Sequence, residues 1–389
     1  MIRPLLLAAT LATPAAAQTC GGPFDAFVEG LKAEALAQGR APAAVDRFFQ
    51  GVRRDQRTLD ADRRQGVFQI PFVDFARRLI SADRMSRGRA NMARLADVFA
   101  RAETEHGVPA GILTAFWAFE TDYGAVQGDF LTRDSLVTLA HDCRRPDLFR
   151  PQVLAAVELA ERGGLDPQRT TGAWAGEIGQ VQMLPGDILV NGIDGDGDGT
   201  VDLKGSAVDA ILSGAKLLSH LGWRAGEPWL VEVDVPAGFD WSRSGLDVKR
   251  PASAWLAEGL APRANAVPGD LPASVIAPQG KDGPVFLAFP NFETLFEWNE
   301  SFVYVATAAY FATRLEGAPV FRGDGAAAGL GPDAMERLQR LLVGRGHDVG
   351  DVDGILGRNT RRAVRAEQAR LGLDPDGWPT PDLLRALAG

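Results

Sequence analysis

A single glutamate stands in a row of large apolar side chains in the stretch AFWAFETDYGAVQG, residues 115–128. Glu120 follows Phe116 by four residues and Trp117 by three, so a helix through this stretch places the glutamate on its apolar face. A carboxyl group that loses hydration there has a raised pKa and can keep its proton near neutral pH. A general acid that protonates a leaving oxygen needs that state. The alternative is a structural glutamate at the mouth of a packed helix, held by a hydrogen-bond partner.

A second stretch, DGDGDGTVDLKG at residues 194–205, has oxygen-bearing side chains at every second position. Hard cations such as Ca2+ are bound by this spacing, and Gly199 permits the sharp turn of an EF-hand type of loop. The twelfth position is Gly205 instead of glutamate, so the loop is not a standard EF-hand. The stretch predicts a structural calcium site, and an acidic turn without metal is the alternative. The predicted ligands are Asp194, Asp196, Asp198, Thr200 and Asp202.

The composition describes a soluble globular chain. Its 389 residues are enough for two or three domains, and 46% of them are hydrophobic and 23% charged. The formal net charge is -9 and no basic run stands out, which makes nucleic acid an unsuitable partner and disfavours anionic lipid.

The N-terminus has the pattern of a cleaved signal peptide, residues 1–17. Arg3 precedes a short apolar run and small residues that end at Ala17, so the mature chain is expected to start near Gln18 in the periplasm. A membrane anchor is the alternative, but the apolar run is too short to span a bilayer. Thr19 before Cys20 argues against a lipoprotein.

Cys20 and Cys143 are the only cysteines. In an oxidising compartment they allow one internal disulfide, which would connect the mature N-terminus to the region around Glu120. Two free thiols are the alternative, and the sequence has no Cys/His cluster suited to zinc.

Periodicity and composition divide the chain after residue 23 into five regions. Apolar residues recur at helical spacing over most of 24–221, and helical patterning returns at 292–315. Between them, 225–290 is rich in Pro, Gly, Val and Asp and contains short β-like runs. The small residues of 322–332 predict a flexible linker to a separate unit, 333–389.

Four segments follow the motif order of the membrane-bound type B family of lytic murein transglycosylases, which the chain resembles over roughly residues 24–320. They are ETDYG (120–124), SLVTLAHDCRRPDLFRPQ (135–152), GAWAGEIGQVQMLPGDI (172–188) and GPVFLAFPNFETLFEWNESFVYVATAAYFATRL (283–315). The resemblance implies a mainly α fold with a lysozyme-like α+β catalytic domain, residues 18–321. It also implies cleavage of peptidoglycan glycan strands between N-acetylmuramic acid and N-acetylglucosamine, with formation of a 1,6-anhydro ring and no catalytic cofactor.

The family's functional residues can be placed on matching positions of this sequence. The resemblance makes Glu120 the catalytic acid and base, and it makes Asp209, just inside the next helix, the acid that closes the predicted calcium loop. The residues that it implies for substrate binding are Gln182, Tyr304, Trp174 and Tyr123.

The resemblance also explains how one carboxylate could be enough. Ordinary glycoside hydrolysis needs two carboxyl groups. Asp122 is expected on another face of the helix, and Glu177, in the glycine-rich segment, is expected to be exposed to solvent. In a lytic transglycosylase one group protonates the glycosidic oxygen and then takes a proton from the C6 hydroxyl that attacks C1. The rivals are a muramidase that hydrolyses the bond with Glu177 as second carboxylate, and a wall-binding protein without catalysis.

The last unit, 333–389, resembles the peptidoglycan-binding type 1 module. The stretch 335–377 has the module's leucine, Gln and Asp-Gly positions and predicts a small three-helix domain. His347, Leu356 and Glu367 stand where such modules usually carry aromatic residues, which affects the expected wall affinity and not the fold.

Overall fold

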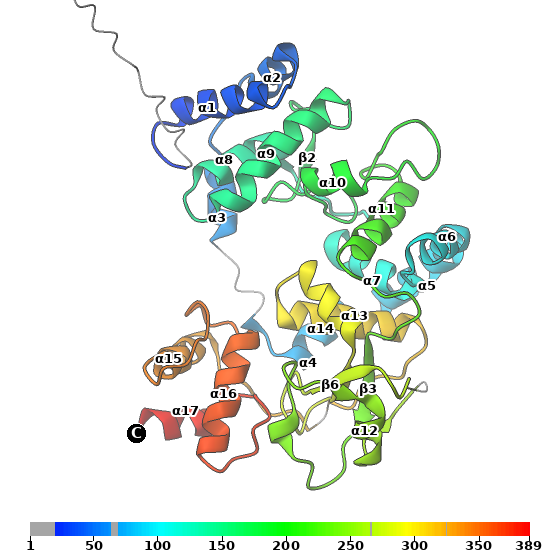
Figure 1. Ribbon diagram of the computed structural model, residues 1–389, viewed down its shortest axis with the longest axis vertical. Coiled ribbons are helices and arrows are strands. Elements are labelled where there is room, and N and C mark those ends of the chain that lie inside the picture. Colours follow the sequence, from blue (N-terminus) through cyan, green and yellow to red (C-terminus); the bar gives the residue numbers. More distant parts are fainter. Residues whose placement is uncertain (1–19, 64–68, 265–266, 324) are drawn as a thin grey trace, which may run out of the picture.

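The computed structural model describes residues 20–63, 69–264, 267–323 and 325–389 (Figure 1). The expected signal peptide lies outside these residues. Helices dominate, as predicted, and an antiparallel sheet and a C-terminal helical unit complete the chain. Among the described residues no helix combines the length and the apolar character needed to cross a membrane.

The first half of the chain is helical. Its helices are α1 (Phe24–Ala37), α2 (Pro42–Phe49), α3 (Gln56–Asp62), α4 (Phe72–Leu79), α5 (Ala82–Arg94), α6 (Ala96–His106), α7 (Ala110–Thr121), α8 (Thr132–His141), α9 (Pro146–Glu161), α10 (Pro185–Asn191) and α11 (Ala207–His220). The strands β1 (Phe130–Leu131) and β2 (Thr171–Gly172) pair antiparallel beside them. Cys20 and Cys143 form a disulfide that connects the start of α1 to the turn between α8 and α9.

The region expected to contain β-like runs forms a five-stranded antiparallel sheet in the order β4-β6-β7-β3-β5. Its strands are β3 (Leu230–Asp234), β4 (Arg250–Pro251), β5 (Ala261–Pro262), β6 (Pro272–Ile276) and β7 (Phe286–Ala288). Helix α12 (Ala252–Ala257) packs on one face of the sheet through Trp255. A separate apolar core on this face contains Trp255, Val233 and Leu287. The other face joins the large helical core through Leu230, Ile276 and Phe286.

Two helices at the centre of the large core position the site. Helix α7 and helix α14 (Phe302–Leu315) are apolar on nearly every side, and each buries most of its residues. A helix of this kind is stable only when other elements surround it. Both helices pack against each other, and the short helix α13 (Pro290–Thr294) and the 3-10 turn Leu295–Glu297 lead into α14.

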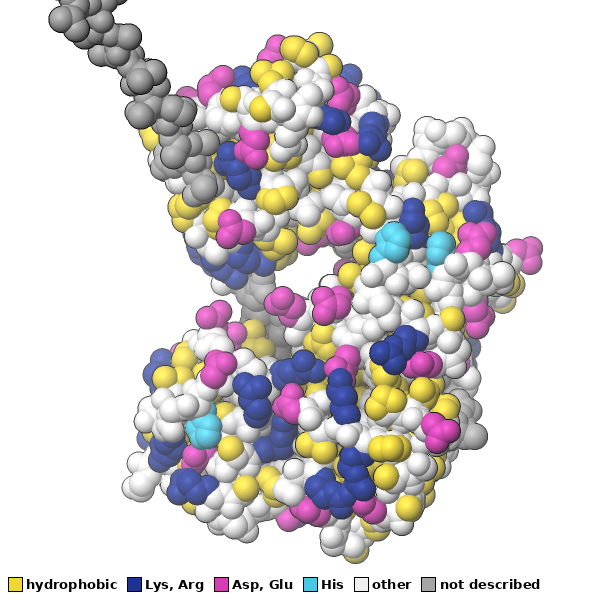
Figure 2. Space-filling view, in the orientation of Figure 1, with side chains coloured by type: hydrophobic (Ala, Val, Ile, Leu, Met, Phe, Trp, Pro, Cys, Tyr) yellow, Lys and Arg dark blue, Asp and Glu magenta, His cyan; other side chains and the backbone are white. Residues whose placement is uncertain are grey.

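The C-terminal unit has three helices, as expected: α15 (Pro332–Val343), α16 (Arg358–Arg370) and α17 (Pro381–Ala388), around a separate apolar core. It is docked on the body. Arg361 Nη2 donates to Pro278 O (2.7 Å), and Gln69 Nε2 donates to Asp353 O (2.9 Å). Figure 2 shows Lys and Arg side chains gathered where this unit meets the body.

The described part of the expected linker is not free. Leu330 is buried in the C-terminal core, and Ala326 packs on the large core. Gln279 Nε2 also donates to Ala327 O (3.1 Å). These residues therefore contact both the large core and the C-terminal core, and the flexibility of the segment stays a prediction. The domain boundaries themselves stay a prediction.

Candidate active site

Glu120 lies in the last turn of α7 with its carboxylate between α7 and α14. Its Oε1 accepts two hydrogen bonds, from Tyr304 Oη (2.5 Å) and from Trp298 Nε1 (3.0 Å). Burial raises the pKa of Glu120, and these two donors oppose the rise because they favour the carboxylate form. Among the described residues both of its donors reach the same oxygen, Oε1.

The backbone directly after Glu120 is fixed in an uncommon conformation. Asp122 (φ 51°), Tyr123 (φ 64°) and Gly124 (φ 85°) are all left-handed, and they follow directly after α7, which ends at Thr121. A left-handed residue other than glycine costs on the order of 1 kcal/mol. Neighbouring contacts offset this cost: Thr121 Oγ1 donates to Gln180 O (2.6 Å) and accepts from Gly124 N (2.9 Å).

Asp122 takes part in this anchoring. Arg87 Nη2 donates to both of its carboxylate oxygens (2.8 and 2.9 Å), and Arg84 Nε donates to Oδ1 (3.1 Å). The Arg87 hydrogen bond, followed by that of Arg84, lowers the pKa of Asp122. The carboxylate thus stays ionised and ties the end of α7 to α5.

Trp298 lies in the segment that leads into α14, and Tyr304 lies in the first turn of that helix. Ser301 caps this helix, since its Oγ accepts from Tyr304 N (3.4 Å), and the ring of Trp298 lies on that of Phe116 with centroids 4.5 Å apart. Burial and the charge of Glu120 raise the pKa of Tyr304 well above its usual range, so its hydroxyl keeps the proton that it donates. Trp298 was missed in the sequence. The feature that could have pointed to it is a tryptophan in the otherwise polar stretch EWNES, directly after a helical segment.

The glycine-rich segment forms a tight hairpin closed by the bridge between Ile178 and Met183. Gln180, 6% exposed, accepts from Trp117 Nε1 (3.0 Å) and fixes the hairpin against α7. Gln182 has a positive φ of 52°, and its Nε2 donates to Gly179 O (2.6 Å). Its amide therefore braces the hairpin, and the expected role in substrate binding stays a prediction.

Glu177 is not exposed to solvent, which corrects the expectation. It is half-buried, and its Oε2 is buried without a hydrogen-bond partner among the described residues. Burial, with the nearby charge of Glu120 as a smaller cause, raises the pKa of Glu177 to about 7. The hairpin brings this side chain toward α7, which the local sequence could not indicate.

Tyr123 and Trp174, the two other residues predicted to bind substrate, have different structural surroundings. The hydroxyl of Tyr123 donates to Arg84 O (2.6 Å), in a space that Gly88 leaves open because a Cβ there would lie 2.7 Å from the hydroxyl. Tyr123 thus connects α7 to α5 in this structure. Trp174 is partly buried, with Arg145 Cζ 6.0 Å from its ring centroid. Neither contact tests sugar binding, which remains a prediction for both.

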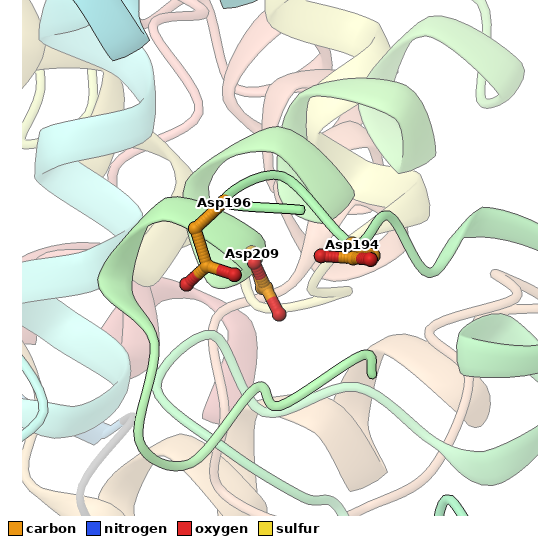
Figure 3. A group of neighbouring side chains, drawn as sticks. All are labelled: Asp194, Asp196 and Asp209. Atoms are coloured by element: carbon orange, nitrogen blue, oxygen red, sulfur yellow. The ribbon is translucent and has the colours of Figure 1, made fainter. Parts of the chain in front are cut away.

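The acidic loop brings three of the six predicted metal ligands together. One carboxylate oxygen from each of Asp194, Asp196 and Asp209 lies within 4.8 Å of the others (Figure 3). Asp209, only 1% exposed, also accepts from Gly195 N (2.9 Å) and Asp202 N (2.8 Å), which closes the loop onto α11. The three remaining side chains lie outside this group: Asp198 Oδ1 accepts from Thr200 Oγ1 (2.7 Å), and Asp202 Oδ1 accepts from Gly205 N (2.9 Å).

Comparisons with known families match nearly the whole described chain. Residues 23–313 match the transglycosylase SLT domain, and residues 332–387 match a peptidoglycan binding domain. Membrane-bound lytic murein transglycosylase B of Escherichia coli (strain K12) is 27% identical over 235 residues, which are 60% of this chain and 64% of that protein. The match thus spans less than two thirds of the E. coli relative.

Solved structures share the fold. SltB3 from Pseudomonas aeruginosa in complex with NAG-anhNAM-pentapeptide has a TM-score of 0.86 and 35% identity, and the match covers 95% of this chain and 100% of that chain. The E. coli lytic transglycosylase Slt35 in complex with calcium has a TM-score of 0.65 and 24% identity, with 77% of this chain and 96% of that chain covered.

Proposed function

Because the chain belongs to the transglycosylase SLT domain family, we propose that it is a lytic transglycosylase of peptidoglycan. It cleaves the β-1,4 bond between N-acetylmuramic acid and N-acetylglucosamine and forms 1,6-anhydro-N-acetylmuramic acid. The observation that carries the proposal is Glu120, a carboxyl group with a raised pKa whose Oε1 is held by Tyr304 and Trp298. The complex of SltB3 with NAG-anhNAM-pentapeptide supports the same product class.

The reaction needs one proton carrier. Protonated Glu120 donates its proton to the glycosidic oxygen as the bond from that oxygen to C1 breaks. The 2-acetamido group offsets the positive charge that develops at C1. The C6 hydroxyl then attacks C1 and returns its proton to Glu120, so no water is consumed. Between these steps Glu120 is a carboxylate, which the hydrogen bonds from Tyr304 and Trp298 stabilise.

The hydrolytic rival depends on Glu177. A second carboxylate that acts as base or nucleophile must be ionised. Glu177, with a pKa raised to about 7, is protonated in acidic solution and only about half ionised near neutral pH, and its Oε2 has no hydrogen-bond partner among the described residues. These features favour a lytic mechanism. A wall-binding protein without catalytic activity would not need a carboxyl group with a raised pKa that is held by two aromatic donors.

Product analysis tests the proposal. Purified sacculi treated with the protein are expected to release muropeptides one water lighter than those from a hydrolysing muramidase, with no new reducing ends, as measured by mass spectrometry and borohydride labelling. Glu177→Gln should give the same products at a similar rate. Reducing-end muramic acid from the natural protein, lost in Glu177→Gln, would establish hydrolysis instead.

We also propose that the acidic loop binds a structural Ca2+. Three carboxylates whose oxygens lie within 4.8 Å repel one another, and a hard divalent cation offsets that repulsion. Asp194, Asp196 and Asp209 would hold the ion, with Asp198, Thr200 and Asp202 completing the predicted set. The ion would stabilise the segment between the glycine-rich hairpin and α11 and take no part in the reaction.

Calcium should therefore raise the melting temperature. A ligand that binds only the folded state adds about 2.7 kcal/mol to the free energy of unfolding at a hundred times its dissociation constant. Asp194→Ala with Asp196→Ala should abolish the shift, measured by calorimetry with calcium or chelator, and Asp270→Ala, an exposed aspartate elsewhere, should preserve it. Equal melting curves for the natural protein in both buffers would leave the loop as an acidic turn.

The substrate places the site of action outside the cytoplasm. We propose the periplasm, reached through the signal peptide predicted at residues 1–17, with Gln182, Trp174 and Tyr123 as further substrate contacts. The disulfide between Cys20 and Cys143 supports an oxidising compartment. Labelling of intact and osmotically shocked cells with an antibody tests this assignment.

A further inference from the structure

Both donors to Glu120 belong to one short segment, residues 298–304, which runs from the 3-10 turn into the first turn of α14. Trp298 follows the 3-10 turn Leu295–Glu297, and Tyr304 lies in the first turn of α14. Asn299 Oδ1 accepts from Ser301 N (2.9 Å) in the link between them. A displacement of this segment would therefore move both hydrogen-bond donors relative to Oε1 of Glu120.

The C-terminal unit touches this segment at two phenylalanines. Arg358 Cζ lies 5.4 Å from the ring centroid of Phe296, and Arg361 Cζ lies 4.3 Å from that of Phe302. The two rings are 6.2 Å apart and pack as a pair. Each phenylalanine precedes one donor by two residues, Trp298 in the first case and Tyr304 in the second.

The guanidinium of Arg361 lies between Phe302 of the body and Trp378 of its own unit, whose ring centroid is 5.7 Å from Cζ. Arg361 is 7% exposed, its Nη2 donates to Pro278 O (2.7 Å), and its Nε is buried without a hydrogen-bond partner. The ion pairs of the described residues do not include Arg361. Burial lowers its pKa to about 9, which is the signature of a cation without close compensation. A ring face is a good neighbour for such a group.

Arg358 has a second attachment on the body. Its Nη2 lies 3.9 Å from Glu293 Oε2, and the same carboxylate accepts from Lys249 Nζ (2.9 Å). Arg358 and Arg361 are three residues apart on α16 and share one face of that helix. One rigid element of the C-terminal unit therefore contacts both phenylalanines.

We propose that helix α16 of the C-terminal unit positions the two donors of the catalytic acid, with Arg361 as the principal positioning residue and Arg358 as the second. Through Phe302 and Phe296 these arginines hold Tyr304 and Trp298 at hydrogen-bond distance from Glu120. The C-terminal unit is then part of the machinery that sets the rate, in addition to any wall binding. The inference rests on the proposed lytic function.

The proposal has a signature in the pH profile. Hydrogen bonds from Tyr304 and Trp298 lower the pKa of Glu120. If the segment that carries these donors is displaced, the hydrogen bonds weaken and the pKa of Glu120 rises. Among the described residues, the titratable groups whose pKa responds to the charge of Glu120 are Tyr304 itself and Glu177 of the hairpin. The alkaline limb of the rate, where Glu120 loses its proton, then moves to higher pH.

The test measures cleavage of short soluble glycan fragments by full-length variants. Arg361→Ala should lower kcat about tenfold, as lost orienting partners do, with little change in KM. The alkaline limb of kcat should move to higher pH. Arg361→Lys, which keeps a cation over Phe302, should restore part of the loss. Arg362→Ala, an exposed neighbour on the same helix, is the matched control and should behave as the natural protein.

A second variant covers the case in which Arg361→Ala undocks or unfolds the C-terminal unit. Phe302→Leu keeps an apolar side chain but removes the ring face, and it should show the same fall in kcat and the same shift of the limb. If both variants keep the natural kcat and pH limb, the inference is overturned and the unit serves other purposes. The products of the natural protein separately decide the lytic function, since 1,6-anhydro products stand whichever way these variants behave.

Discussion

Glu120→Gln is expected to lower kcat by on the order of 100- to 10,000-fold, the usual cost of a lost general acid. The amide keeps the shape of the side chain and can still accept from Tyr304 and Trp298, but it cannot give a proton to the glycosidic oxygen. Rates on soluble glycan fragments, with anhydro products quantified by mass spectrometry, measure the loss. Glu177→Gln, the same chemical change on the other carboxyl group of the site, is the matched control.

The stability of this variant gives a second readout. The pKa of Glu120 in the folded protein is raised above its unfolded value. Its contribution to the free energy of unfolding is therefore present at low pH and is lost as the pH rises through the folded pKa. Glutamine removes this loss. The melting temperature of Glu120→Gln should therefore equal or exceed that of the natural protein at alkaline pH. Retained turnover in this stable variant would move the catalytic acid to another residue.

Tyr304→Phe should lower kcat by about 10- to 100-fold while the fold persists, because one of two donors to Oε1 is lost and the carboxylate formed during the reaction is less stabilised. The Tyr304 hydrogen bond lowers the pKa of Glu120, so its removal raises that pKa. The alkaline limb of kcat/KM should consequently move to higher pH. Steady-state kinetics across pH, on the soluble fragments, provides both values.

Tyr310→Phe is the control for this prediction. Tyr310 lies on the same helix, but its hydroxyl accepts from Phe321 N (3.0 Å) and lies away from the carboxylate. Its loss should leave the pH limb in place. An unchanged limb in Tyr304→Phe would mean that the contact with Glu120 has no part in setting its protonation.

Local pattern was sufficient to predict a carboxyl group on an apolar helix face and a mainly helical chain, while the catalytic role of Glu120 and the lysozyme-like fold came from the family resemblance. Glu120 was found because helical spacing placed a carboxyl group on an apolar stripe, and that stripe is what packs α7 against α14. The spacing of the acidic loop likewise predicted Asp194 and Asp196, which the structure brings together. Asp209 and Tyr304 required the family resemblance, since both act across the fold and not along the chain.

Features that depend on contacts between residues far apart in the chain could not be predicted from the sequence. Trp298 is 178 residues from Glu120 along the chain, and no periodicity connects them. Glu177 was expected in solvent because a glycine-rich stretch seemed to be an open loop, but the Ile178–Met183 bridge folds it inward. The docking of the C-terminal unit depends on Arg361, whose burial beside Phe302 contradicts the ordinary preference of arginine for water.

The disulfide between Cys20 and Cys143 also links the stability of the protein to the compartment in which it resides. The two cysteines are 123 residues apart in sequence, and in the chain-entropy account a closed loop of that length destabilises the unfolded state by roughly 5 kcal/mol. Most domains have a free energy of unfolding of about 5–15 kcal/mol. A copy retained among cytosolic reductants would lack this contribution and spend more time open to proteases. Failed export would thus shorten the lifetime of the chain as well as separate it from its substrate.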